Sequence, residues 1–251
     1  MARKIGDFVG TGEVSYESVW WRAYNQVTSI NVGEGLTLIP SGIRHDNAAI
    51  NSVFGDTKTL TTVTMPTVTA IGDYVFYKAT ALTSVDMPNV TSIGEGAFAY
   101  TALTSVDLPN VTSIGEEAFR YATALTSVNM PNVTEIGDWA FAVAKALTSV
   151  NMPKVTSIGE DAFRYATSLT RVDMPNVTKI GEDAFIATSK LTCVRMSSSA
   201  KMCSSGGCSA MNSSNFDKIF SGNSALKGKY SKKCSISGEF LICGDCEWGS
   251  N

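Results

Sequence analysis

The chain has 251 residues, of which 44% are hydrophobic and 17% charged, and its formal net charge is −3. This length allows one or two domains with a sizeable core. The negative charge argues against a nucleic-acid-binding protein, no apolar run approaches the roughly 20 residues of a membrane-spanning helix, and a single histidine, His45, excludes mechanisms that need two.

The N-terminal segment predicts a cap followed by a degenerate first repeat. The first residues are basic but no apolar stretch follows them, so a signal peptide is not predicted. Residues 21–30 align with residues 119–128, which places a first coil at about 11–32. Surplus residues at 41–47, including His45, are expected to form a loop insertion. Four aromatic residues are expected to cover this end: Tyr16, Trp20, Trp21 and Tyr24.

A unit of 21 or 22 residues then recurs along a predicted solenoid segment, 33–196. Its leading leucines are Leu60, Leu82, Leu103, Leu125, Leu147, Leu169 and Leu191. A proline, a glycine and a phenylalanine recur at the same interval, as Pro109, Gly115 and Phe119 do in the unit 103–124. This period, with an L-x-x-L-x-L core, is typical of leucine-rich-repeat solenoids.

Each unit reads as a strand followed by a bend. Leu103, Val106 and Leu108 are predicted to point inward, whereas Ser105 and Asp107 point outward, because side chains alternate along a strand.

The second half of the unit reads as a turn that returns the chain to the next strand. Proline cannot donate to a sheet ladder, so Pro109 ends the strand. Gly115 is expected in a tight bend, and Glu116 and Glu117 at the start of a short helical turn that buries Phe119. The predicted fold is therefore an α/β solenoid, a leucine-rich-repeat superhelix of about eight 22-residue coils (strand plus short helical turn) with N- and C-terminal caps.

The repeat closely resembles the BspA-like, or Treponema-type, leucine-rich-repeat family. That family repeats L-x-x-I-x-I/L-P, then V-x-x-I-G-x-x-A-F, then a small residue or cysteine before the next leucine. Residues 60–196 match in every unit and residues 16–59 match weakly. Alanine or threonine stands here where the family often has cysteine, three residues after the phenylalanine.

The resemblance implies a non-enzymatic module for protein recognition or adhesion, extracellular or associated with a cell or virion surface. The implied partner is another protein or a surface glycan, with no nucleic acid and no membrane insertion. The alternative is a purely structural spacer of a filament or phage appendage. Cytoplasmic location and any oligomeric state stay open.

Two surfaces are candidates for binding. One is the outward face of the strands, a polar strip with these candidate residues: Asp86, Asp107, Asn129, Asn151, Arg171, Asp173 and Arg195. Its alternative role is a solvated face, because its side chains are mostly small and binding hot spots favour Trp, Tyr and Arg. The other candidate is an aromatic edge after the glycine: Tyr74, Tyr100, Arg120, Tyr121, Trp139, Arg164 and Tyr165. Its alternative is that the rings cover the seams between coils and expose only hydroxyl groups.

The C-terminal segment 197–251 shifts to Ser, Gly, Lys and Cys and is predicted to be a cap. All cysteines of the chain lie beyond residue 192: Cys193, Cys203, Cys208, Cys234, Cys243 and Cys246. Disulfides, a structural zinc site and free thiols all remain open. Disulfides are preferred, and no other cofactor is expected.

Overall fold

A computed structural model describes residues 27–33, 35–44, 50–51, 53–223, 226, 233–236 and 239–243. The predicted N-terminal aromatic cap, His45 and Cys246 lie outside the described residues.

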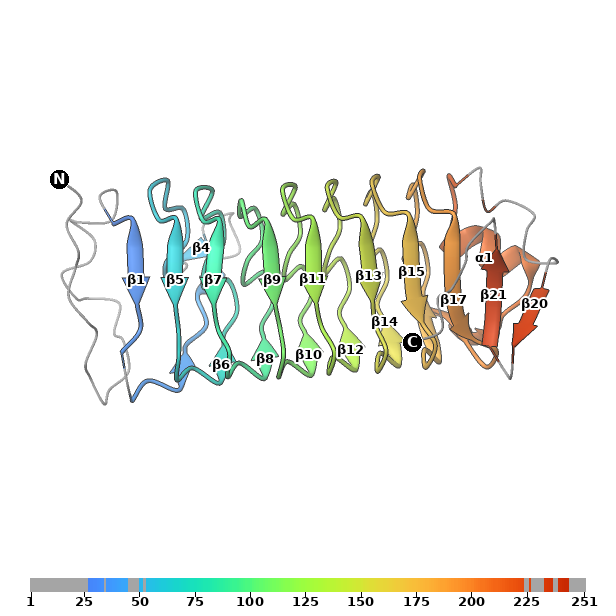
Figure 1. The fold of residues 1–251 in the computed structure, drawn as a ribbon, viewed down its shortest axis with the longest axis horizontal. Coiled ribbons are helices and arrows are strands. Elements are labelled where there is room, and N and C mark those ends of the chain that lie inside the picture. Colours follow the sequence, from blue (N-terminus) through green and yellow to red (C-terminus); the bar gives the residue numbers. More distant parts are fainter. Residues whose placement is uncertain are drawn as a thin grey trace.

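The chain forms a β-solenoid of about 6 complete turns, built from stacked coils of about 22 residues (Figure 1). The first strands of the coils lie along one side of the solenoid (Figure 1), in a parallel sheet whose pairing is interrupted between the third and the fourth strand. These strands are β1 (Ser29–Asn31), β5 (Thr62–Thr64), β7 (Ser84–Asp86), β9 (Ser105–Asp107), β11 (Ser127–Asn129), β13 (Ser149–Asn151), β15 (Arg171–Met174) and β17 (Cys193–Ser197). Equivalent residues face one another in successive coils, as Val106 faces Val128. The alternation of inward and outward residues is confirmed.

A second parallel sheet is built from a shorter strand in each coil. Its strands are β2 (Leu38–Ile39), β6 (Ala70–Ile71), β8 (Ser92–Ile93), β10 (Ser113–Ile114), β12 (Glu135–Ile136), β14 (Ser157–Ile158), β16 (Lys179–Gly181) and β18 (Lys201–Ser204). Since β18 pairs in parallel with β16, the solenoid pattern continues past residue 196, where the sequence repeat ends.

Irregular elements lie towards the two ends of the array. An antiparallel pair, β3 (Ile43–Arg44) and β4 (Ile50–Asn51), interrupts the coil that contains β2. At the other end, β19 (Gly207–Ala210) pairs with β18, and β21 (Glu239–Cys243) lies antiparallel between β17 and β20 (Lys233–Ile236). Helix α1 (Ser213–Ile219) is the only α-helix in the described ranges, and none there is long and apolar enough to cross a bilayer.

A continuous core runs the length of the array, as the sequence predicts. A column of phenylalanine rings stacks through it, with centroids 5.0–5.5 Å apart. The rings belong to Phe54, Phe76, Phe98, Phe119, Phe141, Phe163, Phe185 and Phe220. Because Phe220 follows α1, the helix occupies the place of the next turn and closes this end of the column.

Polar side chains fix the spacing between coils. Thr126 Oγ1 donates to the Thr104 carbonyl oxygen at 2.9 Å, and other threonines of the repeat bond the preceding coil in the same way. Asn110 Nδ2 donates to the Pro88 carbonyl oxygen at 2.7 Å. The glycine column allows the closest approach, because a Cβ added at Gly137 would lie 2.6 Å from the Glu116 amide nitrogen.

The segment after each glycine is a pair of tight turns and not the short helical turn that the sequence predicts. In one coil the Ala118 amide donates to the Gly115 carbonyl oxygen, and the Ala122 amide donates to that of Phe119. The third residue of each turn has a left-handed backbone, with φ of 55° at Glu117 and 59° at Tyr121. Left-handed residues cannot continue an α-helix, so the chain reverses twice and returns to the strand ladder.

Candidate functional site

The tight turns of successive coils form one edge of the solenoid, which we call the turn edge. We define it by the side chains that project from these turns between residues 77 and 187: Tyr77, Lys78, Tyr100, Glu117, Arg120, Tyr121, Trp139, Asp161, Arg164, Tyr165 and Asp183. Apart from Tyr74, the candidate aromatic edge of the sequence lies within this set.

The turn geometry places large side chains on this edge. Two left-handed positions recur in the coils, one two residues after the glycine and the other four residues later. Trp139 occupies the first, with φ of 58°, while Tyr100, Tyr121 and Tyr165 occupy the second, with φ of 58–61°. A left-handed non-glycine residue costs roughly 1 kcal/mol or more. The fold therefore maintains strained backbone at the positions that carry these rings.

Rings and guanidinium groups form a continuous row along the turn edge. Tyr100 stacks on Tyr121 with ring centroids 4.5 Å apart. The Arg120 guanidinium carbon lies 5.3 Å from the Tyr121 ring centroid and 4.8 Å from that of Trp139. The Arg164 guanidinium carbon lies 5.5 Å from the Trp139 ring centroid and 4.9 Å from that of Tyr165. The half-buried Trp139 ring thus contacts an arginine from each neighbouring coil, and these contacts stiffen the whole row.

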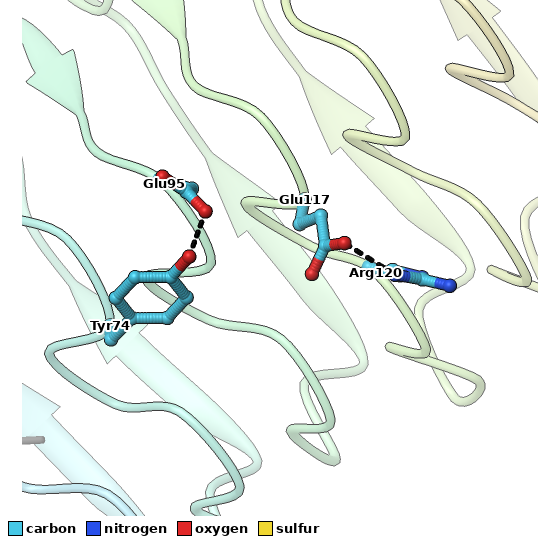
Figure 2. Close-up of polar contacts among 4 residues, drawn as sticks. All are labelled: Tyr74, Glu95, Glu117 and Arg120. Carbon is cyan, nitrogen blue, oxygen red and sulfur yellow. Dashed lines mark hydrogen bonds and ion pairs between the residues drawn. The ribbon is translucent and has the colours of Figure 1, made fainter. Parts of the chain in front are cut away.

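Each of these arginines is also held by an acid three residues earlier. Arg120 forms an ion pair with Glu117, which Figure 2 shows. Arg164 Nη1 donates to Asp161 Oδ1 at 2.9 Å, and this hydrogen bond raises the pKa of Arg164. Because the carboxylates fix the guanidinium planes against the rings, the row is ordered before any partner binds.

Tyr74 does not contribute to the exposed surface, although the sequence places it on the aromatic edge. Its side chain is 4% exposed. The Tyr74 hydroxyl donates to Glu95 Oε1 in the next coil (Figure 2). At this position the next coil has Gly96, so the tyrosine ring folds over the glycine and is buried.

The predicted strand-face residues lie in columns on the outward side of the first strands of the coils. Asn129 Nδ2 donates to Asp107 Oδ1 at 2.7 Å, and Arg195 Nε donates to Asp173 Oδ1 at the same distance. Asp86, Asp107, Asn129 and Asn151 are exposed, whereas Arg171, Asp173 and Arg195 are half-buried. The described strand face carries no aromatic ring among these columns, so it offers a polar and shallow surface.

The C-terminal cysteines include at least one disulfide, between Cys203 and Cys208, whose Cα atoms are 4.1 Å apart across the β18–β19 pair. Cys193 is also disulfide-bonded, and the residue opposite it in the β17–β21 ladder is Cys243. Cys234 lies in β20. Within the described ranges, no three His, Cys, Asp or Glu residues gather as a metal site would require.

Sequence reasoning missed the acidic members and the N-terminal end of the turn edge. Tyr77 extends the row of rings, with its centroid 5.5 Å from that of Tyr100. The i,i+3 spacing of Glu117 with Arg120, and of Asp161 with Arg164, is visible in the sequence and is a signal that could have identified the ion pairs.

The C-terminal end of the turn edge carries excess negative charge. Burial raises the pKa of the Asp183 carboxyl group, the carboxylates of Asp161 and Glu182 raise it further, and Arg164 and Lys218 lower it by less. Burial likewise raises the pKa of Glu160, and the neighbouring carboxylates, Asp161 first among them, add to the shift. Ionised carboxylates are therefore less favourable here than in water.

The comparisons with known proteins agree with the fold. The profile of the BspA type leucine rich repeat region matches residues 48–164, 91–206 and 144–228, with 6 copies. The crystal structure of a Treponema pallidum leucine rich repeat protein is similar, with 24% identity and a TM-score of 0.56 over 65% of this chain and 78% of that one.

A leucine rich cell surface protein from Faecalibacterium prausnitzii is 22% identical, with a TM-score of 0.43 over 78% of this chain and 63% of that one, so the match spans less than two thirds of its length. No curated protein matches the chain. The Treponema structure supports the fold, and the family profile covers more than half of the residues. The chain belongs to the BspA type leucine-rich-repeat family.

Proposed function

We propose that this protein is a non-enzymatic recognition or adhesion module that acts on a cell or virion surface and binds another protein or a surface glycan through its turn edge. The array is inferred to run to about eight coils, with an N-terminal cap and a degenerate first coil at 1–32 and a C-terminal cap at 197–251. The family and its repeat scaffold support protein interaction and a surface location.

The observation that carries the proposal is the row of contacting rings and guanidinium groups on the turn edge. Trp, Tyr and Arg are the residues that most often dominate binding energy. Their contacts with one another order the side chains in advance, which lowers the entropy cost of binding. A spacer has no need of a row of stacked rings and guanidinium groups, whereas the strand face alone would suit one.

This function is tested by selecting ligands for the chain and then measuring how they bind to matched variants. Peptide-display and glycan libraries are screened against the full chain, and the selected ligands are measured on two double variants. Tyr121→Ala with Trp139→Ala truncates the turn edge, and Asp107→Ala with Asn129→Ala truncates the strand face. Circular dichroism confirms that both variants fold.

Loss of binding only in the turn-edge variant is the expected result. Loss only in the strand-face variant moves recognition to that face. The absence of any selected ligand favours the structural spacer and contradicts the proposal.

A further inference from the structure

The N-terminal end of the turn edge has an excess of positive charge. Lys78 is exposed, with its Nζ 5.0 Å from the Tyr77 ring centroid, and it forms no ion pair in the part of the chain that the structure describes. The turn of the preceding coil carries Asp56 and Lys58, whose charges offset each other. The charge of Lys78 is therefore available to a partner.

The C-terminal end of the turn edge has the opposite excess. The Asp183 carboxylate forms no ion pair within the described ranges, and the nearby Lys218 pairs with Glu182 instead, with Nζ 3.5 Å from Oε1. Arg164 lowers the pKa of Asp183 but donates its hydrogen bond to Asp161.

Between the two ends, the charges of the turn edge are already paired. Arg120 pairs with Glu117, and Arg164 pairs with Asp161. The edge thus runs from a positive end, through a neutral row of contacting rings and guanidinium groups, to a negative end. A surface with this pattern is complementary to a reversed copy of itself.

The coil count allows such a reversed pairing. Lys78 follows Phe76 by two residues and Asp183 precedes Phe185 by two, so they lie in the first and the sixth of six successive coils (Figure 1). A two-fold axis across the middle of these six coils relates the first coil to the sixth. Since the coils of both copies stack at about 4.8 Å, each coil can meet one coil of the other copy.

We propose that a second copy of this chain docks on the turn edge, antiparallel to the first about that two-fold axis, with Lys78 of each copy beside Asp183 of the other. This inference rests on the recognition function proposed above and names the partner, so that recognition takes place between identical chains. Two-fold symmetry is the commonest arrangement of homodimers, and it uses the same patch on both copies.

This arrangement gives the contact the composition of a protein interface. Arg120, Tyr121 and Trp139 lie in the two coils beside the axis, and such residues most often dominate binding when they are central. The charges at the ends fix orientation, because a parallel arrangement places like charges together. A strip of six coils is about 25 Å long, and so narrow a contact falls below the standard interface of about 1,600 Å², which predicts a weak dimer.

Reversal of charge at the two ends provides a test in which binding is first lost and then regained. Lys78→Glu places two acids together at both ends of the dimer, and Asp183→Lys places two lysines together there. Both residues have left-handed backbone, which Glu117 shows to be open to glutamate and Lys78 to lysine. Lys154→Glu and Asp86→Lys make the same charge changes at exposed positions away from the turn edge and serve as matched controls.

Sedimentation equilibrium of the full chain at low salt, at concentrations up to about 1 mM, measures the association. Wild type should form dimers that added salt weakens. Lys78→Glu and Asp183→Lys should each weaken association about tenfold, because two exposed ion pairs become repulsive. An equimolar mixture of these two variants should regain association, since both contacts then join opposite charges. The control variants should associate as wild type does, and circular dichroism confirms that all variants fold.

A chain that stays monomeric at the highest concentration would overturn the proposal, as would equal losses in the controls or a mixture that fails to associate. A monomer whose selected ligands need Tyr121 and Trp139 would exclude the second copy as partner and leave the recognition function intact. A monomer for which the libraries yield no ligand would contradict both.

Discussion

Replacing Phe141 by alanine tests whether the ring column holds the coils together. Phe141 is 0% exposed, and its ring centroid lies 5.2 Å from those of Phe119 and Phe163. Truncation of a buried phenylalanine costs about 3–5 kcal/mol, through lost burial and the cavity left behind. Two aromatic pairs are lost as well, at about 0.5–1.5 kcal/mol each beyond burial. Phe141→Ala should therefore fall in the upper part of the cavity range.

Trp139→Ala is the matched comparison, because Trp139 lies in the same turn two residues earlier and projects onto the turn edge. It loses two exposed cation–π contacts, at about 0.5–1 kcal/mol each, and leaves no core cavity. We expect a loss of about 1–2 kcal/mol in the free energy of unfolding. Urea unfolding of both variants gives the comparison. Equal losses would refute the distinction between a core column and a surface row.

Three further changes test the coil spacing, the charge of the turn edge and the modularity of the array. Gly137→Ala should cost about 1–3 kcal/mol because its Cβ would meet backbone atoms of the preceding coil. Gly206→Ala is the control: its Cβ would lie 3.9 Å from the nearest atom, so it should change stability by under about 0.5 kcal/mol. Thermal melts in which the two variants lose equal stability would contradict the close approach at Gly137. Asp183→Asn should raise Tm at neutral pH, because the raised pKa of Asp183 means that ionisation of its carboxyl group destabilises the folded state. The gain in Tm over wild type should shrink as the pH falls through the folded-state pKa and vanish below the ordinary value of 3.8. A gain in Tm that persists in acid would disprove this cause. Deletion of residues 125–146 should leave a folded protein with an unchanged circular-dichroism shape, and aggregation would show that the coils are not modular.

The sequence was sufficient to predict the solenoid and its core because period and side-chain alternation are local signals. Leu103, Val106 and Phe119 are buried as expected, and Ser105 and Asp107 are exposed. Each inward residue meets its equivalent in the next coil, so a pattern repeated at 22 residues determines the packing.

The turn geometry and the ion pairs could not be predicted as well. Acidic residues after Gly115 suggest the start of a helix, but Glu117 and Tyr121 adopt left-handed backbone because neighbouring coils bond those turns, as the Glu117 amide does to the Asp138 carbonyl oxygen. Whether a tyrosine is exposed depends on the next coil, which is why Tyr74 is buried over Gly96 while Tyr165 is open.

The C-terminal segment was the least predictable, because its elements lack the repeat. Because the 22-residue spacing ends before this segment, the sequence did not indicate that β18 would extend the second sheet or that Phe220 would extend the ring column. The pairing of Cys203 with Cys208 follows from the β18–β19 register, which only the tertiary structure supplies.

Backbone amide NMR of the chain bound to its tightest selected ligand tests the central claim that recognition uses the turn edge. The account predicts that shifts concentrate in the turns at 117–121, 139–143 and 161–165, and that strands β9, β11 and β13 change little. Shifts concentrated in those strands, with the turns unaffected, would contradict it.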